Sequence, residues 1–209
     1  MNDPASPSAL DSLLRVMQHG ESLCLHPAGG VVTGGRPCRA VLPGAFNPLH
    51  EGHLRLAEVA ASIVGAPVDF ELSVLNVDKP PLGAEEILRR AGQFANRAYL
   101  WITRAPTFAE KAELFSETTF VIGADTAERL VSARYYQGEA QRLAEAFLRI
   151  RALGCRFLVA GRENAAGVFV GVEDLGLPDG VRDLFTGIPK SALHVPLSSS
   201  ALRGQSGRA

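Results

Sequence analysis

The sequence contains little cysteine and little lysine for its length. Its three cysteines, Cys24, Cys38 and Cys155, lie far apart and form no Cys-x-x-Cys pair. An odd number of scattered cysteines is typical of free thiols in a reducing compartment and disfavours a disulfide framework. The sequence has no apolar run of membrane-spanning length, and its start has no basic and apolar signal segment. We therefore expect a cytoplasmic protein.

The sequence also lacks an excess of either charge. The 209 residues include 21 Lys and Arg against 22 Asp and Glu, a formal net charge of −1. A chain without a basic excess lacks the electrostatic footprint of a nucleic-acid scaffold or of a protein that binds an anionic membrane surface. Its length is sufficient for one domain with a sizeable core. We expect neither nucleic acid nor membrane as a partner, and the totals are compatible with a homo-oligomer.

Short β-rich segments alternate with helical patterns from residue 37 onward. We interpret residues 1–36, with a helical stripe and a glycine-rich stretch, as an N-terminal extension that packs on a domain at 37–209. Strands are expected at 39–43, 68–75, 99–103, 118–122 and 156–160, and helices near 52–64, 84–97, 107–115 and 139–153. This alternation predicts an α/β fold with an open, mostly parallel five-stranded sheet and helices on both faces.

Ligands bind beyond the carboxyl ends of the strands in such a sheet. The loops that follow the five expected strands are 44–53, 76–81, 103–107, 123–125 and 161–162. They contain much of the candidate chemistry of the chain. We therefore expect these loops to converge on one site.

The stretch 41–53 combines a short apolar run, a turn with glycine and proline, and the start of a helix. A helix N-terminus exposes unpaired N–H groups and the positive end of the helix dipole, which suits a phosphate. His50 and His53 add donors that are charged or neutral near pH 7, and Gly44 and Gly52 let the backbone approach a ligand closely.

Two simpler interpretations of the histidines compete with phosphate binding. They could face solvent at a helix start, or they could form a metal-binding pair on one helix face. A zinc site needs three or four ligands, and no other cluster of His or Cys supplies them, so we expect no resident metal.

The residues Gly-Ala-Phe-Asn-Pro-Leu-His-Glu-Gly-His at 44–53 resemble the Gly-x-Phe-x-Pro-x-His-x-Gly-His signature of the HxGH nucleotidyltransferases. The resemblance implies a Rossmann-like domain that transfers a nucleoside monophosphate from an NTP, with Mg²⁺, to a phosphorylated acceptor and releases pyrophosphate. It implies that His50 and His53 stabilise the developing charge. The loop residues that it implies for nucleotide binding are Gly44, Ala45, Phe46, Asn47 and Gly52.

The Phe-Asn-Pro version of the signature is more similar to nicotinate and nicotinamide mononucleotide adenylyltransferases. Cytidylyltransferases of the group usually have Phe-Asp at these positions. The resemblance thus favours ATP over CTP, and Asn47 is the residue that carries the difference.

A second segment, Leu-Ser-Ser-Ser-Ala-Leu-Arg at 197–203, is similar to the family motif Ile-Ser-Ser-Thr-x-Ile-Arg. Serines at a helix start cap it and bind phosphate oxygens, and an arginine one turn later reaches the same anion. A capped helix with a solvated arginine is the alternative. The resemblance implies that Ser198, Ser199 and Arg203 hold the β- and γ-phosphates.

Two strand ends resemble further family segments. Phe-Val-Ile-Gly-Ala-Asp is similar to Ile-Ile-Gly-(Ala/Ser)-Asp and assigns Gly123 and Asp125 to the nucleotide, with a helix-capping Asp125 as the alternative. Phe-Leu-Val-Ala-Gly-Arg resembles a later strand that ends in an arginine near the nucleotide. It assigns Arg162 to the nucleotide, and a plain surface arginine is the alternative.

The loop Asn-Val-Asp-Lys-Pro-Pro at 76–81 departs from the pyridine-nucleotide enzymes, which usually have Asn/Ser-Pro-x-x-x-Lys or Asn-Pro-Pro-His-Lys. Lys79 is one of only three lysines, so a catalytic role competes with that of a solvated loop lysine. The stacking Trp loop of those enzymes has no clear counterpart, because Trp101 lies inside an expected strand and is interpreted as core.

Four arginines on helical patterns are interpreted as solvated: Arg89, Arg90, Arg149 and Arg151.

These observations predict a nucleotidyltransferase whose catalytic residues are His50, His53 and Lys79. Its partners would be ATP or another NTP and a phosphorylated small-molecule acceptor such as a pyridine mononucleotide. The alternatives are a cytidylyltransferase that uses CTP and an NTP-binding or NTP-hydrolysing protein without transfer activity.

Overall fold

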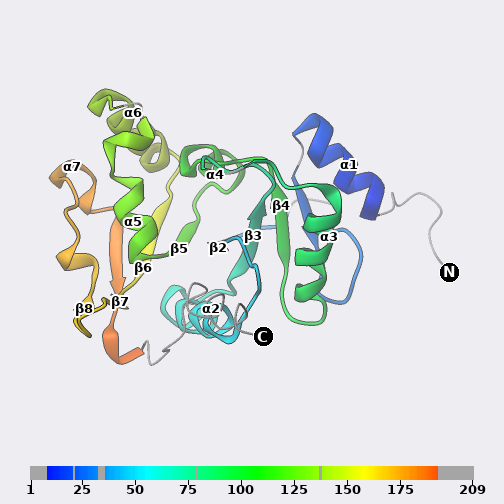
Figure 1. Ribbon diagram of the computed structural model, residues 1–209, viewed down its shortest axis with the longest axis horizontal. Helices are drawn as coiled ribbons and strands as arrows, with labels where there is room; N and C mark the ends of the chain where they lie inside the picture. Colours follow the sequence, from blue (N-terminus) through cyan, green and yellow to red (C-terminus); the bar gives the residue numbers. More distant parts are fainter. Residues whose placement is uncertain (1–8, 21, 33–35, 79, 137, 193–209) are drawn as a thin grey trace.

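The computed structural model describes residues 9–20, 22–32, 36–78, 80–136 and 138–192. A seven-stranded sheet runs through the molecule in the order β1-β4-β3-β2-β5-β6-β9, with helices on both faces (Figure 1). β1 pairs antiparallel with β4, and every other neighbouring pair in this sheet is parallel. The strands are β1 (Leu23–Leu25), β2 (Ala40–Pro43), β3 (Asp69–Ser73), β4 (Leu100–Thr103), β5 (Thr119–Gly123), β6 (Arg156–Ala160) and β9 (Phe185–Ile188).

The helices connect these strands. They are α1 (Ala9–His19), α2 (Glu51–Val64), α3 (Ala84–Ala91), α4 (Phe108–Leu114), α5 (Ala124–Leu130), α6 (Ala140–Ala152) and α7 (Asp179–Arg182). Single 3₁₀ turns lie at Gly92–Phe94, Ala133–Tyr136, Val172–Asp174 and Lys190–Ala192, and a small hairpin is formed by β7 (Arg162–Glu163) and β8 (Phe169–Val170). Within these described segments, none of the helices has both the length and the apolar character that a membrane crossing needs.

The predicted α/β fold is confirmed, and the five expected strands are β2 to β6 at the centre of the sheet. The predicted number of strands is wrong, because β1 and β9 extend the sheet at its two edges. Both are short, with three and four residues, so neither gives a clear period in the sequence. The extended conformation of β1 and β9 depends on pairing with β4 and β6, and only the folded structure reveals that pairing.

The part of residues 1–36 that the structure describes packs on the sheet. α1 buries Leu13 and Val16 in the same apolar cluster as the central strands, and β1 pairs with β4. The interpretation of the segment as an extension separate from the domain stays a prediction.

Two apolar clusters cover the two faces of the sheet. Along β2, Val41 belongs to one cluster and Leu42 to the other, and Phe120 and Val121 of β5 alternate in the same way. Successive side chains of a strand point to opposite faces, and a parallel sheet covered by helices buries both of them. The cluster that contains Leu42 includes residues of α1, α2 and α3, whereas the other includes residues of α4, α5 and α6.

Burial of both faces makes the acidic residues of β3 internal. The side chain of Glu71 is 1% exposed, and Lys111 of α4 donates to both of its carboxylate oxygens at 2.7 Å and to the carbonyl oxygen of Ala105 at 2.7 Å. Thr103 Oγ1 donates to the same carboxylate at 2.5 Å. A buried charge is tolerated when it is paired and fully hydrogen-bonded, as it is here. This ion pair joins β3, the end of β4 and α4.

Asp69, two residues earlier, is paired in the same manner. Arg36 donates to both of its oxygens at 2.9 and 3.0 Å, and the indole of Trp101 donates to it at 3.0 Å. Trp101 also packs edge-on against Phe115, so its interpretation as a structural residue is confirmed. The three cysteines are free thiols as predicted, and burial raises the pKa of Cys24 to about 12.

We predict that Lys111→Met lowers the free energy of unfolding by about 3–5 kcal/mol, because it leaves the Glu71 carboxylate buried without its counter-charge. Urea unfolding followed by circular dichroism measures the change. Arg55→Ala is the control, since it breaks the exposed pair with Glu58 and should cost about 0–1 kcal/mol. Equal effects of the two substitutions would contradict this account of the buried pair.

Candidate active site

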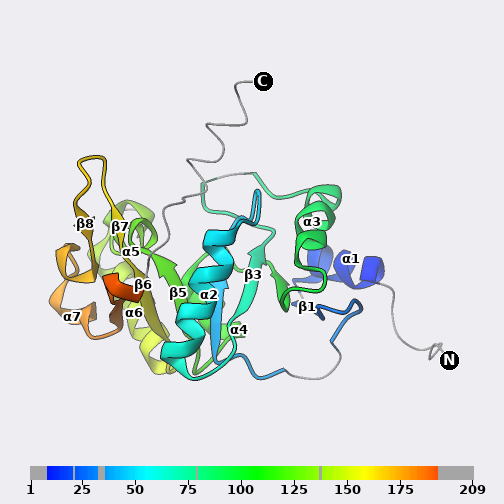
Figure 2. The same cartoon turned by 90° about the horizontal axis from the view of Figure 1, so that it is seen from below.

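The strand order reverses at β2, which has β3 on one side and β5 on the other. In an open parallel sheet this reversal opens a crevice beyond the carboxyl ends of the strands, where ligands bind. The loop 44–50 leaves β2 at this point and leads directly into α2 (Figure 2). The structure therefore places the predicted phosphate loop at the crevice.

Gly44 is required by the packing of the loop itself. A Cβ atom at this position would lie 2.7 Å from two ring carbons of Phe46, closer than real contacts allow. Phe46 is 1% exposed and has a φ of +44°, in the left-handed region that non-glycine residues rarely adopt. Its ring is held edge-on by Phe94 and His53, with centroids at 5.0 and 5.2 Å. The loop is thus built on a buried aromatic anchor.

His50 and His53 lie together at the start of α2. His50 is the N-cap residue, and the two imidazole rings stack with their centroids 3.8 Å apart. The backbone N–H of His50 donates to Nδ1 of His53 at 3.3 Å. Because Nδ1 accepts this bond, a neutral His53 carries its proton on Nε2 and presents it as a donor.

Burial and, as the smaller cause, the neighbouring His50 lower the pKa of His53 to about 4. His53 is therefore neutral near pH 7. A neutral donor at a helix N-terminus, where the dipole is positive, suits an anion without bringing a full charge of its own. Gly52 lies between the two histidines in the first turn of α2.

The loop is also held from outside, by the end of α3 and the turn that follows it. Arg89 donates to the side-chain oxygen of Asn47 at 2.6 Å, and Arg90 donates to the carbonyl oxygen of Ala45 at 2.8 Å. The interpretation of Arg90 as solvated is wrong, because its side chain is only 11% exposed, whereas the side chain of Arg89 is 50% exposed and solvated as predicted. Arg149 and Arg151, by contrast, form exposed ion pairs with carboxylates of α4 and of the segment after α7.

Gly123 and Asp125 lie where β5 passes into α5, and Arg162 lies just beyond the end of β6. The guanidinium of Arg162 forms an ion pair with Asp125 and lies 3.9 Å from Glu128. The structure thus brings Asp125 and Arg162 together on adjacent strand ends. Both side chains are exposed, so each remains accessible to a ligand.

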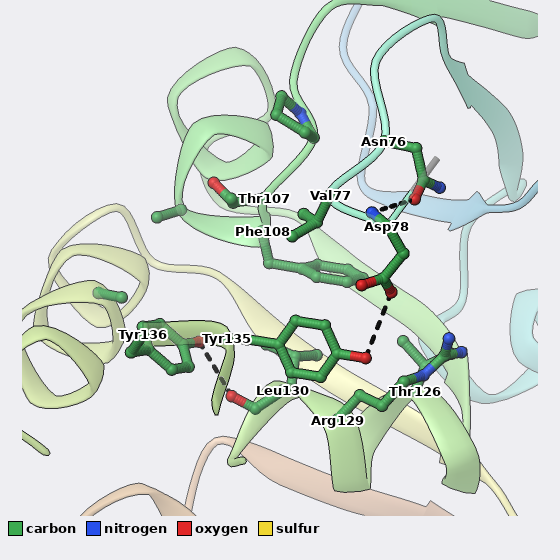
Figure 3. Close-up of a pocket in the computed structure, with 13 residues that line it drawn as sticks. Asn76, Val77, Asp78, Thr107, Phe108, Thr126, Arg129, Leu130, Tyr135 and Tyr136 are labelled. Carbon is green, nitrogen blue, oxygen red and sulfur yellow. Dashed lines mark hydrogen bonds between the residues drawn. The ribbon is translucent and has the colours of Figure 1, made fainter. Parts of the chain in front are cut away.

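A pocket of about 410 Å³ opens between the loops after β3 and β4, α5 and the 3₁₀ turn at 133–136 (Figure 3). Three aromatic rings line it, those of Phe108, Tyr135 and Tyr136. The hydroxyl of Tyr135 donates to Asp78 at 3.3 Å across the pocket. Thr126 also lines it and follows Asp125 directly, so the pocket lies beside the strand-end segment described above.

The tyrosines of this pocket, Tyr135 and Tyr136, are not among the residues that the sequence motifs indicate. They lie in a short 3₁₀ turn between two helices, which has no motif of its own. The sequence feature that indicated this region is the strand-end loop 76–81, whose first three residues line the pocket.

The structure does not test every predicted site residue. Lys79, Ser198, Ser199 and Arg203 lie outside the described residues. Among the residues that it does describe, no group of three or more His, Cys, Asp or Glu side chains is arranged to hold a metal ion.

Residues 41–204 match the model of a protein family described as cytidylyltransferase-like. The match begins in β2 and covers most of the chain, including the loop 44–50, the segment 123–125 and Arg162. It confirms the superfamily that the sequence motifs indicate. No match to a curated protein was found.

We predict that His53 titrates with a midpoint of about 4 and that its neutral form is protonated on Nε2. The folded protein then binds fewer protons than the unfolded chain between pH 4 and 6.5, so His53 contributes stability that is present above pH 6.5 and lost as the pH falls towards 4. Heteronuclear NMR of the imidazole measures both the midpoint and the tautomer. A midpoint above 6, or a proton on Nδ1, would contradict the geometry at the start of α2.

Proposed function

The chain belongs to the cytidylyltransferase-like family and is a nucleotidyltransferase, and on this premise we propose that it transfers AMP from ATP to the phosphate of a small-molecule acceptor such as a pyridine mononucleotide. The observation that carries the proposal is the pair of stacked histidines, His50 and His53, at a helix N-terminus in the crevice of the sheet. Free cysteines support a reducing, cytoplasmic location, where nucleotides are available.

A phosphate oxygen of the acceptor attacks the α-phosphorus of the nucleotide in line. The new P–O bond forms as the bond to the β-phosphate oxygen breaks, and pyrophosphate leaves with both bonding electrons. Such a reaction relies on positioning and on stabilisation of charge. His53, with Nε2–H as a neutral donor, and the N–H groups of the first turn of α2 stabilise the charge that develops on the α-phosphate oxygens. The neighbouring imidazole of His50 acts on the same group.

The nucleotide enters as its Mg²⁺ complex, so the ion is part of the substrate. Mg²⁺ keeps several water ligands and binds phosphate oxygens in such complexes, and needs no dedicated protein cage.

The remaining nucleotide contacts are proposed from the motifs. Ser198, Ser199 and Arg203 hold the leaving pyrophosphate, and Lys79 neutralises charge during transfer. Asp125 faces the ribose, and the exposed Arg162 exchanges its pairing with Asp125 for a contact to the nucleotide.

The pocket beside segment 123–126 receives the organic part of the acceptor. Its volume of about 410 Å³ is within the usual range for small-molecule sites, and most of its lining is apolar with a few polar groups. Phe108 and Tyr135 offer ring faces and edges to a flat heterocycle. Asp78 and Thr107 supply hydrogen-bonding groups at the same pocket. These features favour a nucleotide-like acceptor such as a pyridine mononucleotide.

Transfer of CMP from CTP is the second candidate, and the family description favours it. The Phe-Asn-Pro loop favours ATP by its resemblance to the adenylyltransferases. In the structure the side-chain oxygen of Asn47 accepts a bond from Arg89. Calorimetric titration with ATP and with CTP decides between the two nucleotides.

We predict that His53→Ala lowers kcat by ~10²–10³, because it removes one preorganised donor from the transition state. Release of pyrophosphate in a coupled assay measures the rate. Arg55→Ala, on the exposed face of the same helix, is the matched control and should keep full activity. A loss smaller than about threefold in His53→Ala, far below that donor-loss range, would exclude this role.

A screen of four NTPs against pyridine mononucleotides and other phosphorylated acceptors identifies the reaction. Pyrophosphate that appears only when an acceptor is present establishes transfer. Orthophosphate without an acceptor identifies a hydrolase, and binding without turnover identifies a nucleotide-binding module.

We predict that Tyr135→Leu raises KM for the acceptor by about 2- to 10-fold and leaves KM for the nucleotide unchanged. The loss of an aromatic contact of about 0.5–1.5 kcal/mol gives this range. Tyr135→Phe is the control, since it keeps the ring and removes only the hydroxyl that donates to Asp78. An increase confined to KM for the nucleotide would show that the pocket binds the other substrate.

A further inference from the structure

Side chains of one neighbouring segment, the end of α3 and the turn Gly92–Phe94, form hydrogen bonds with the backbone of the loop between β2 and α2. Arg90 donates to the carbonyl oxygen of Ala45 at 2.8 Å. Gln93 uses both ends of its amide: Nε2 donates to the carbonyl oxygen of Phe46 at 2.9 Å, and Oε1 accepts from the backbone N–H of Leu49 at 2.8 Å. Two consecutive carbonyl groups of the loop are thus directed at the same segment.

These bonds also determine where the following N–H groups point. In a trans peptide the C=O group and the N–H group of the next residue point in opposite directions. Because the carbonyls of Ala45 and Phe46 point towards α3, the N–H groups of Phe46 and Asn47 point away from it. Successive N–H groups directed to one side of a turn form a concavity that binds anions.

This arrangement of the loop needs external support. Phe46 has a φ of +44°, and a non-glycine residue in such a conformation persists only where its surroundings hold it. The buried ring of Phe46 fixes the side chain, but the ring alone leaves the peptide planes on either side free to rotate. The bonds from Arg90 and Gln93 restrict these planes.

The supporting side chains are themselves fixed. The side chain of Arg90 is 11% exposed, and its Nε donates to Glu86 at 2.7 Å. Glu86 also accepts two bonds from Arg89, whose guanidinium holds Asn47. Hydrogen bonds from Arg89 and Arg90 lower the pKa of Glu86 to about 2, so its charge is present at every working pH.

We propose that Arg90 and Gln93 are positioning residues for nucleotidyl transfer: they turn the N–H groups of Phe46 and Asn47 towards the phosphates of the bound nucleotide. The inference rests on the proposed function. It assigns a role to side chains whose hydrogen bonds with the loop are made to its backbone. It also explains why a glutamine stands at position 93, since no other side chain of this length both donates to a carbonyl and accepts from an N–H.

The first test is spectroscopic and needs no turnover. The probe is the Mg²⁺ complex of a non-hydrolysable α,β-methylene ATP, added to ¹⁵N-labelled full-length protein. In the wild type we expect the amide protons of Phe46 and Asn47 to shift downfield, and in Gln93→Leu we expect these two shifts to be lost. Arg97→Ala, an exposed arginine just beyond the same turn, is the control and should show the shifts of the wild type.

The second test is kinetic. Gln93→Leu and Gln93→Glu should each lower kcat by ~10²-fold, the loss typical of one preorganised donor, with KM for the nucleotide changed less than threefold. Gln93→Glu keeps an acceptor for the N–H of Leu49 but has no donor for the carbonyl of Phe46. This variant therefore tests the bond to Phe46 separately from the bond to Leu49. Arg90→Lys keeps the charge and loses the planar fork, and should also reduce kcat.

The outcomes separate this inference from the proposed function. Wild-type amide shifts without pyrophosphate release would contradict the proposed transfer and leave standing the orientation of these N–H groups towards the phosphates of a bound nucleotide. Full transfer activity in all three variants, or a wild type whose Phe46 and Asn47 amides do not respond to the probe, would overturn the positioning role. If Gln93→Leu does not fold, Gln93→Glu and Arg90→Lys decide the question by the same two measurements.

Discussion

β2 pairs with β3 on one side and with β5 on the other, in parallel in both cases. The chain reaches β3 and β4 on one side before it returns to β5, β6 and β9 on the other. Because the connections on the two sides of β2 run in opposite directions, a crevice opens beyond the carboxyl end of β2. This crevice is the common location of several segments: the loop 44–50, the start of α2, the end of β5 and the loops after β3 and β4.

The same topology places demands on the interior. Because helices cover both faces of the sheet, polar residues of the central strands need partners inside the protein. Glu71 makes two contacts that stabilise the interior and the site. Its carboxylate binds Lys111, which fixes α4 next to the aromatic pocket, and its carbonyl oxygen accepts the N–H of Gly44 at 2.9 Å at the start of the phosphate loop. The buried ion pair thus connects the two halves of the proposed site.

Sequence patterns predicted the central strands and the family because both depend on local information. A β-rich run such as that around Phe120 and Val121 is read directly, and the glycine, histidine and proline spacing at 44–53 is specific enough to indicate its superfamily. The edge strand β1 was missed since its three residues owe their conformation to pairing with β4. Arg90, Gln93 and Tyr135 were missed for the same reason: their roles depend on contacts more than 40 residues away along the chain.

In the proposed mechanism the chemistry depends on a neutral His53 and on backbone N–H groups oriented by Arg90 of α3 and by Gln93 of the turn that follows it. The most direct test of this account is ³¹P NMR of the enzyme with MgATP and a pyridine mononucleotide, using an α-thio nucleotide of one configuration. The account predicts equimolar pyrophosphate and a pyrophosphate-bridged product with inverted configuration at the α-phosphorus. Retention of configuration, or orthophosphate as the only product, would contradict it.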